Sequence, residues 1–130
     1  MDDQEKAVIS ANRNFYAAFN NADMTEMKKI WSSAFDISVI HPGWSPLHGW
    51  QDVMASWESI LDGNDVTGIS AAGERVYCIR NMAYVICTEM LQQNELTATN
   101  IFIREEDGWK MVHHQAGVLA QNLDDQFNVH

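Results

Sequence analysis

Three polar side chains stand among apolar neighbours at alternate positions of predicted strands. Residues two apart in a strand lie on the same face of a sheet. Alternation groups Glu89 with the apolar residues of its own strand, namely Val85, Cys87 and Leu91. It groups Asn100 with Ala98 and Phe102, and it groups His113 with Trp109, Met111 and Gln115. If these three faces point inward, a carboxylate, an amide and an imidazole converge on one cavity.

Such a trio has the chemistry of an acid–base site. An apolar pocket disfavours the ionised carboxyl, so the pKa of Glu89 is expected to rise toward the range useful for a general base. An imidazole exchanges protons near neutral pH, and an amide can donate a hydrogen bond to an oxyanion. We therefore predict Glu89 and His113 as catalytic residues and Asn100 as a ligand-binding residue. The alternative is a buried polar cluster whose members only satisfy one another.

The choice between His113 and His114 rests on strand parity alone. Adjacent residues of a regular strand point to opposite faces, so only one of the two histidines can face the cavity. Regular alternation selects His113 and places His114 with Val112, Ala116 and Val118 on the other face. A single β-bulge would exchange the two histidines.

The segment SVIHPGWSPLHGW, residues 38–50, contains two histidines and two tryptophans between an apolar run and an amphipathic one. Pro42 stiffens the backbone and Gly43 permits a turn, so the loop can hold Trp44 over a cavity with His41 beside it. We predict His41 and Trp44 as ligand-binding residues at the rim. The alternative is that Trp44 and Trp50 only fill the space between the sheet and the following helix.

The sequence contains few of the residue patterns that bind metals or cofactors. A site made of His41, His113 and Glu89 is conceivable, but no HxH or HxxxH spacing joins the histidines. The motifs GxSxG, GxGxxG and the P-loop do not occur. We therefore predict no bound metal and no cofactor.

The charge excludes several classes of partner. The chain has 130 residues and a net charge of −10, with eight scattered Lys and Arg residues. Nucleic acids and anionic membrane surfaces attract basic patches, so neither is an expected partner. No apolar run approaches the length of a membrane span, and the first residues, MDDQEK, lack the apolar region of a secretory signal. We expect one cytoplasmic domain over residues 1–130, with its core at about residues 5–120.

The first half of the chain reads as helical around one short strand. Apolar residues recur at helical spacing before a break at residues 20–23, and Asp23 with Glu26 predicts the start of a second, short helix. Residues 35–40 then predict a short strand. A third helix is predicted over residues 49–61 from the spacing of Trp50, Val53, Met54, Trp57, Ile60 and Leu61.

The second half changes to strand periodicity. Short turn signals separate four runs rich in β-branched and aromatic residues, at 66–79, 82–91, 96–104 and 109–119. Connections this short require antiparallel hairpins. The predicted class is therefore α+β, with N-terminal helices covering one face of a four-stranded meander.

This order of elements resembles the nuclear-transport-factor-2-like superfamily. The segments IHPGW, LHGW and ATNIF, and DGW followed by VHH, are similar to the SnoaL-like branch around the ketosteroid-isomerase homologues. The final hairpin also resembles the association domain of calcium/calmodulin-dependent kinase II. The likeness spans roughly residues 5–120. It implies a cystatin-like cone, in which a curved antiparallel sheet wraps around the helices and encloses a cavity open at one end.

The resemblance leaves function open, because this fold carries isomerases, cyclases, hydrolases, dehydratases, binding modules and oligomerisation domains. Our first hypothesis is a cofactor-independent isomerase or cyclase that abstracts a proton beside the carbonyl of an apolar ligand. Glu89 would be the base, while His113 and Asn100 would orient the ligand. The alternative is a non-catalytic ligand-binding or dimeric assembly module.

The resemblance also implies a homodimer formed through the outer face of the sheet. Alternation assigns apolar residues to that face, namely Tyr84, Ile86, Ile101, Ile103, Val112 and Val118. An apolar face of this size is unusual on a monomer.

Overall fold

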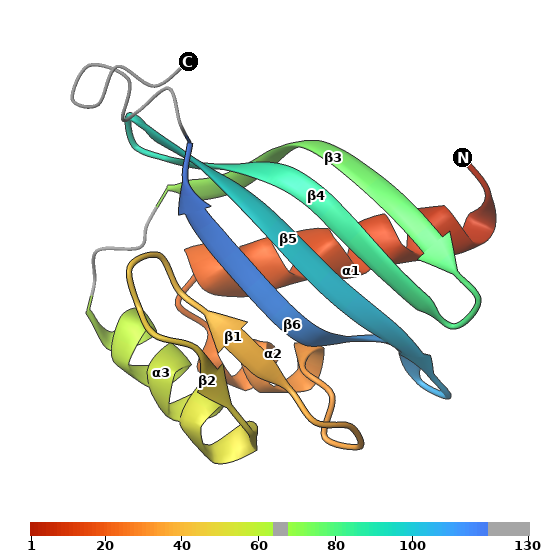
Figure 1. Cartoon of the computed structure of the whole chain (residues 1–130), viewed down its shortest axis with the longest axis horizontal. Coiled ribbons are helices and arrows are strands. Elements are labelled where there is room, and N and C mark those ends of the chain that lie inside the picture. Colours follow the sequence, from red (N-terminus) through yellow and green to blue (C-terminus); the bar gives the residue numbers. More distant parts are fainter. Residues whose placement is uncertain (64–67, 120–130) are drawn as a thin grey trace.

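The structure is a computed structural model that describes residues 1–63 and 68–119. Within these residues the helices are α1 (Asp3–Asn20), α2 (Met24–Ile30) and α3 (Trp50–Asp62). The strands are β1 (Ser38–Ile40), β2 (Leu47–His48), β3 (Ile69–Ile79), β4 (Met82–Leu91), β5 (Asn94–Glu105) and β6 (Gly108–Val118). Figure 1 shows a curved sheet with α1 lying along one face and the other helices beside its β1–β2 edge. The predicted α+β class is confirmed.

The sheet has the strand order β2-β1-β6-β5-β4-β3. Strands β3 to β6 form the predicted antiparallel meander, and the β3–β4 and β4–β5 hairpins each close through two residues. The predicted four-residue turn at 92–95 is therefore too long, because β5 already begins at Asn94. Strand β2 and the parallel pairing of β1 with β6 were not predicted from the sequence.

Local capping explains where the first two helices begin. The Asp2 carboxylate accepts a hydrogen bond of 2.8 Å from the backbone N–H of Glu5, and the Glu5 carboxylate accepts one of 3.0 Å from the backbone N–H of Asp2. This is a capping box, which satisfies two otherwise unpaired N–H groups. Asp23 caps α2 by accepting from the backbone N–H of Glu26, as its sequence predicted. None of the helices in the described residues has the length and hydropathy that a membrane span requires.

The core lies between the helices and the inner face of the sheet. Its largest fully buried side chains are aromatic, and Trp57 of α3 joins the layers. The Trp57 ring meets Phe15 and Phe19 of α1 edge to face, at centroid distances of 5.5 and 5.0 Å. It also lies 5.8 Å from the His114 ring of β6. Trp57 therefore fixes α3 against both α1 and the sheet.

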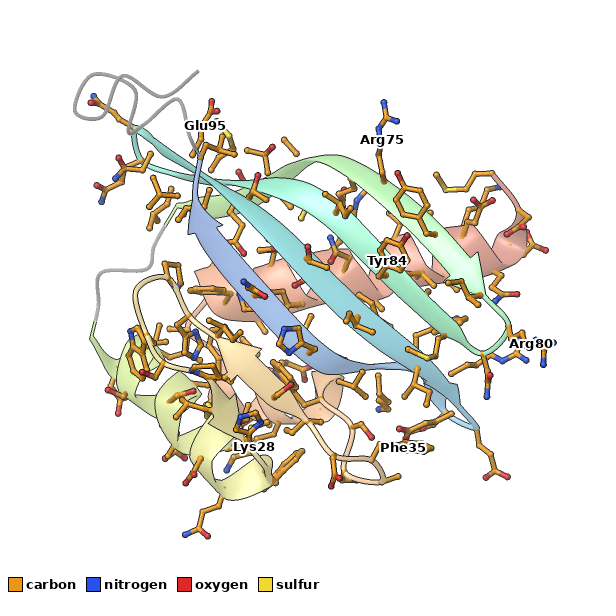
Figure 2. The ribbon with its side chains drawn as sticks, viewed as in Figure 1. Lys28, Phe35, Arg75, Arg80, Tyr84 and Glu95 are labelled. Carbon is orange, nitrogen blue, oxygen red and sulfur yellow. The ribbon has the colours of Figure 1, made fainter. Side chains whose placement is uncertain are left out.

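The outer face of the sheet is apolar and partly exposed. Tyr77 of β3 stacks on Tyr84 of β4 with a centroid distance of 4.8 Å, and Ile86 is 41% exposed. Tyr84 and Arg75 project from this face in Figure 2. A surface with this composition is available for contact with another apolar surface.

Candidate functional site

A β-bulge in β6 decides which histidine enters the core. Ile101 of β5 pairs with His113, whereas the next residue, Phe102, pairs with Met111. Val112 is therefore an extra residue on β6, and alternation restarts after it. Met111 and His114 both face inward, with exposed fractions of 0% and 1%. The predicted placement of His113 in the cavity is wrong for this reason, and His114 takes that position.

His113 lies instead on the outer side of the sheet, next to β1. Its Nδ1 is 2.7 Å from the hydroxyl oxygen of Ser38, the residue opposite it in the parallel β1–β6 register. Partial burial lowers the pKa of His113. The sheet separates this ring from Glu89, so the structure does not bring the two predicted catalytic residues together.

Glu89 faces inward as predicted and is only 2% exposed. The Tyr16 hydroxyl donates a hydrogen bond of 2.7 Å to Glu89 Oε2, and His114 Nε2 lies 3.7 Å from the same oxygen. Burial raises the pKa of Glu89 to about 7, against the opposing effect of the hydrogen bond from Tyr16. The carboxyl therefore exchanges its proton near neutral pH, which is what a general base requires.

Asn100 lies behind Glu89 and is fully buried. Its Nδ2 donates to Asn12 Oδ1 at 2.8 Å and to the Tyr16 hydroxyl at 3.2 Å. Its Oδ1 lies 2.6 Å from His114 Nδ1. Protein side chains contact both ends of the amide, so this geometry does not favour the predicted ligand-binding role of Asn100, which stays a prediction. Asn100 orients the groups that surround Glu89.

Tyr16 and Asn12 belong to this cluster but were not predicted as site residues. Both are buried on α1, at the helical spacing that also buries Val8 and Phe15. A tyrosine and an asparagine within an apolar helical stripe need polar partners once they are buried. That requirement was the available signal for a polar cluster between α1 and the sheet.

An inner cavity of about 190 Å³ opens beside Glu89. Glu89, His41 and His114 supply its ionisable groups, and Trp44 and Pro42 come from the predicted rim loop. Its remaining walls are apolar side chains of α1, α3 and the strands, namely Phe19, Ile60, Ile69, Leu91 and Leu96. Three of the five predicted site residues, Glu89, His41 and Trp44, therefore line one cavity.

His41 forms the inner part of the rim and is 3% exposed. Its Nε2 is 2.9 Å from the Ser56 hydroxyl oxygen, and that hydroxyl already donates to the carbonyl of Val53 at 2.7 Å. His41 Nε2 is therefore the donor of its bond to Ser56. Burial lowers the pKa of His41 to about 4 and that of His114 to about 3, so both rings are neutral at neutral pH.

Trp44 stands at the outer part of the rim and is 44% exposed. Its ring lies 5.0 Å from that of His41 in an edge-to-face arrangement. Trp50 is also partly exposed, at 39%. Trp44 lines the inner cavity and Trp50 does not, so the interpretation as a rim residue applies to Trp44 alone.

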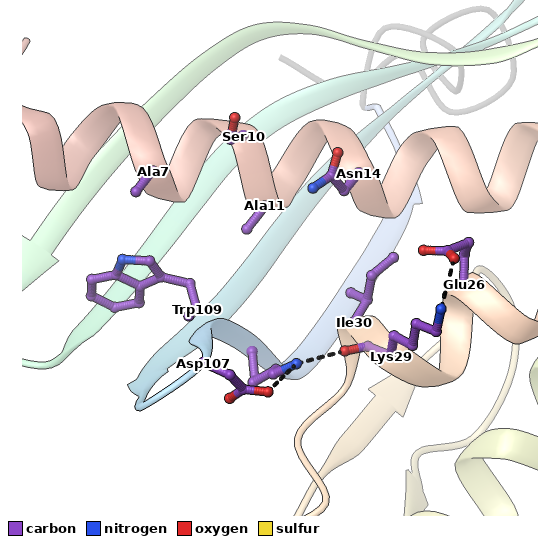
Figure 3. A pocket seen from close by; sticks show the side chains of 11 residues that line it. Ala7, Ser10, Ala11, Asn14, Glu26, Lys29, Ile30, Asp107 and Trp109 are labelled. Atoms are coloured by element: carbon purple, nitrogen blue, oxygen red, sulfur yellow. Dashed lines mark hydrogen bonds and ion pairs between the residues drawn. The ribbon is translucent and has the colours of Figure 1, made fainter.

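A larger surface depression of about 480 Å³ lies between α1, α2 and the β5–β6 turn (Figure 3). Its charged groups already neutralise one another. Lys29 pairs with Glu26 at 3.2 Å, and Lys110 pairs with Asp107 at 3.2 Å. Since it contains none of the predicted site residues, we assign the candidate site to the inner cavity.

No group of three potential metal ligands is assembled among residues 1–63 and 68–119. The conceivable site of His41, His113 and Glu89 does not form, because the β6 bulge turns His113 to the outer side. The inner cavity instead holds one carboxyl and two neutral imidazoles, which suits proton transfer on a small apolar molecule.

The amino-acid sequence is similar to those of known proteins. The sequence model of the SnoaL-like domain family matches residues 8–121. F-box protein SKIP8 of Arabidopsis thaliana is 24% identical over 123 residues, which make up 93% of this chain and 52% of that protein. The chain therefore spans about half the length of this plant relative.

Solved structures agree with the sequence match. A putative dehydratase of the NTF2-like family from Streptomyces avermitilis has a TM-score of 0.82 and 28% identity, covering 88% of this chain and 95% of that one. A putative calcium/calmodulin-dependent protein kinase type II association domain from Thiobacillus denitrificans has a TM-score of 0.72 and 30% identity, covering 85% and 94%. The similar proteins thus include one described as an enzyme and one described as an association domain.

Proposed function

This chain belongs to the SnoaL-like domain family, and from that premise we propose that it is a small-molecule enzyme that works without a cofactor. Glu89 takes a proton from the carbon beside a carbonyl group of a compact, largely apolar ligand held in the inner cavity. The observation that carries this proposal is a carboxyl with a pKa of about 7 in the wall of an apolar cavity.

The proton transfer is balanced within the ligand and the carboxyl. The ionised Glu89 takes the hydrogen as a proton, and the electron pair of the C–H bond stays on the ligand as an enolate. Return of the proton to another carbon gives an isomer and restores Glu89. Burial keeps the pKa of the Tyr16 phenol well above its usual range, so Tyr16 stays protonated and holds the carboxylate by its hydrogen bond.

The volume of the inner cavity limits the ligand. An apolar protein cavity of roughly 150 Å³ holds benzene, so about 190 Å³ suits a single ring with a small substituent. An outer groove of about 450 Å³ shares Pro42, Leu91 and Leu96 with the cavity. We therefore propose a ligand with one ring beside Glu89 and any longer substituent directed along the groove.

The similar structure from Streptomyces avermitilis, described as a putative dehydratase, supports a proton-transfer reaction. Elimination of water from a β-hydroxy carbonyl compound also begins with loss of the proton beside the carbonyl. Isomerisation and dehydration therefore place the same demand on Glu89. They differ in whether the ligand carries a hydroxyl leaving group.

The test uses single-ring ketones, such as cyclohexanone and cyclohexenone, incubated with the protein in D₂O. Proton NMR measures exchange of the hydrogens beside the carbonyl. We expect the protein to accelerate the exchange and Glu89→Gln to slow it by at least about 100-fold, the usual effect of losing a general base. Glu58→Gln, which removes an exposed carboxylate of α3, is the matched control and should retain the rate.

The second candidate is a non-catalytic binding or assembly module, favoured by the similarity to the putative association domain. The exchange experiment, combined with a thermal-shift measurement on the same ketones, separates the two. Binding of a ring ketone, seen as a rise in melting temperature, without any accelerated exchange would contradict the enzymatic proposal and favour a binding module.

A further inference from the structure

A chain of hydrogen bonds connects Glu74, outside the inner cavity, with the cavity wall. Asn12 Nδ2 donates to Glu74 Oε2 at 2.8 Å, and Asn12 Oδ1 accepts from Asn100 Nδ2 at 2.8 Å. Asn100 Oδ1 then lies 2.6 Å from His114 Nδ1. The three residues between Glu74 and the cavity, Asn12, Asn100 and His114, are each no more than 1% exposed.

The bond directions in this chain follow from its first member, and the Tyr16 hydroxyl, which donates to Glu89, favours the same orientation by accepting from Asn100 Nδ2. A carboxylate accepts hydrogen bonds and cannot donate them. Glu74 therefore requires the amide nitrogen of Asn12, which leaves the Asn12 oxygen to face Asn100. Asn100 must then present its own nitrogen to Asn12 and its oxygen to His114. The hydrogen in the last bond can only come from His114 Nδ1.

A neutral imidazole carries one N–H group, so His114 Nε2 has none when Nδ1 is the donor. We propose that Glu74 is a positioning residue that selects the Nδ1–H tautomer of His114 through Asn12 and Asn100. Glu74 thereby leaves His114 Nε2 as a hydrogen-bond acceptor beside Glu89. The assignment of the tautomer stands independently, whereas its value for catalysis rests on the proposed function.

The opposite orientation of the chain would change the chemistry of Glu89. With both amides reversed, His114 Nδ1 would accept from Asn100 and Nε2 would carry the hydrogen. That Nε2–H would face Glu89 Oε2, which lies 3.7 Å away. A positively polarised N–H directed at the ionised carboxyl favours its charged form and makes it a weaker base. By preventing this arrangement, Glu74 keeps Glu89 available for a proton from the ligand.

A second β-bulge, in β3, positions the Glu74 side chain for this role. The β3–β4 register shifts between Ala72 and Arg75, where Gly73 has a φ of +64°. The extra residue turns Glu74 toward α1 and Arg75 toward the outer face. The Arg13 side chain lies 3.2 Å from Glu74 Oε1, so the carboxylate is held at both oxygens.

The tautomer is measured directly by ¹⁵N NMR of the histidine rings at neutral pH, with His114 assigned by the loss of its signals in His114→Gln. Protonated and bare ring nitrogens have well-separated shifts. We expect the wild-type protein to show Nδ1–H, although imidazole in water prefers Nε2–H. Wild-type protein with His114 in the Nε2–H form would overturn the proposal.

Substitutions of Glu74 test its part in the selection. Glu74→Gln retains an acceptor oxygen and should keep Nδ1–H. Glu74→Lys presents only donors, so it should reverse both amides and give Nε2–H. Adding Asn12→Asp to Glu74→Lys restores an acceptor facing Asn100 and should return His114 to Nδ1–H. An unchanged tautomer in Glu74→Lys would overturn the role of Glu74.

If Glu74→Lys does not fold, Glu74→Leu decides the matter, because it removes the acceptor without adding charge. We expect Glu74→Leu to show a substantial fraction of Nε2–H, and a pure Nδ1–H signal would overturn the proposal. The readout needs no substrate, so a lack of ketone exchange in the wild-type protein would contradict the proposed function and leave this inference standing.

Discussion

Glu89 shows how burial and one hydrogen bond set the chemistry of a carboxyl. Burial disfavours its charged form, while the Tyr16 hydroxyl partly stabilises that form. His41 and His114 lie close by, but burial holds both rings neutral, so neither supplies a positive charge to Glu89. The result is a base that ionises near neutral pH.

This environment predicts how stability depends on pH. The pKa of Glu89 is raised from 4.5 to about 7, so the folded state holds a proton that the unfolded state has lost between these values. The stability of the wild-type protein relative to Glu89→Gln should therefore fall by about 3 kcal/mol as pH rises from 4.5 to 7, and level off above it.

Urea denaturation of both proteins at several pH values measures this difference. The three histidines with lowered pKa, His41, His113 and His114, remain in Glu89→Gln, so their effect, a loss of stability as pH falls below 6.5, cancels in the comparison. A difference that does not change between pH 4.5 and 7 would show that the folded protein does not raise this pKa.

At the residue scale, alternation correctly predicted that Glu89 and Asn100 face inward, because β4 and this part of β5 are regular. It failed for His113, because no residue type marks Val112 as the extra residue of a bulge. The rim residues His41 and Trp44 were found from their loop chemistry. Tyr16 was missed because a tyrosine on an apolar helical stripe resembles an ordinary core residue.

At the scale of elements, prediction followed the strength of the periodic signal. Helix α3 begins within one residue of the predicted start, because six apolar residues repeat at helical spacing. Strands β1 and β2 have three and two residues, which are too few to show alternation. Their pairing with each other and with β6 depends on contacts between distant parts of the chain.

The β3 bulge offers a test at this scale. Gly73 has a φ of +64°, and a Cβ added there would meet no atom within 4 Å. Gly73→Ala should therefore destabilise the protein by about 1 kcal/mol through backbone strain alone. Gly117→Ala also meets no atom within 4 Å and lacks the positive φ, so it is the matched control. Equal midpoints for the two variants in urea denaturation would contradict the strained bulge.

At the scale of the whole molecule, the order of elements and a few short motifs were enough to predict a SnoaL-like fold, and the family match confirms it. The curved sheet gives the molecule two different surfaces. Its inner face encloses the cavity, and its outer face carries exposed apolar residues that include Tyr77, Ile79 and Ile86. The β6 bulge places Val118, which was predicted on the outer face, on the inner side with His114 and Ala116. The fold alone supports both a catalytic and an assembly role.

We propose that this outer face joins two copies of the chain. Sedimentation at micromolar concentration should give about twice the mass of one chain, which is 14.8 kDa. Ile86→Glu places a charge in the face and should yield monomers, whereas Glu58→Gln on α3 should remain dimeric. A wild-type monomer under these conditions would show that the outer face is not a contact between copies.

The central claim is that Glu89 ionises near neutral pH inside the inner cavity. A ¹³C NMR titration of the Glu89 side-chain carboxyl, assigned by its loss in Glu89→Gln, tests this claim most directly. We predict a midpoint at about pH 7 in the free protein, and a shift of that midpoint when a ring ketone fills the cavity. A midpoint near the ordinary value of 4.5 that is unaffected by the ketone would contradict the role of Glu89 as the base.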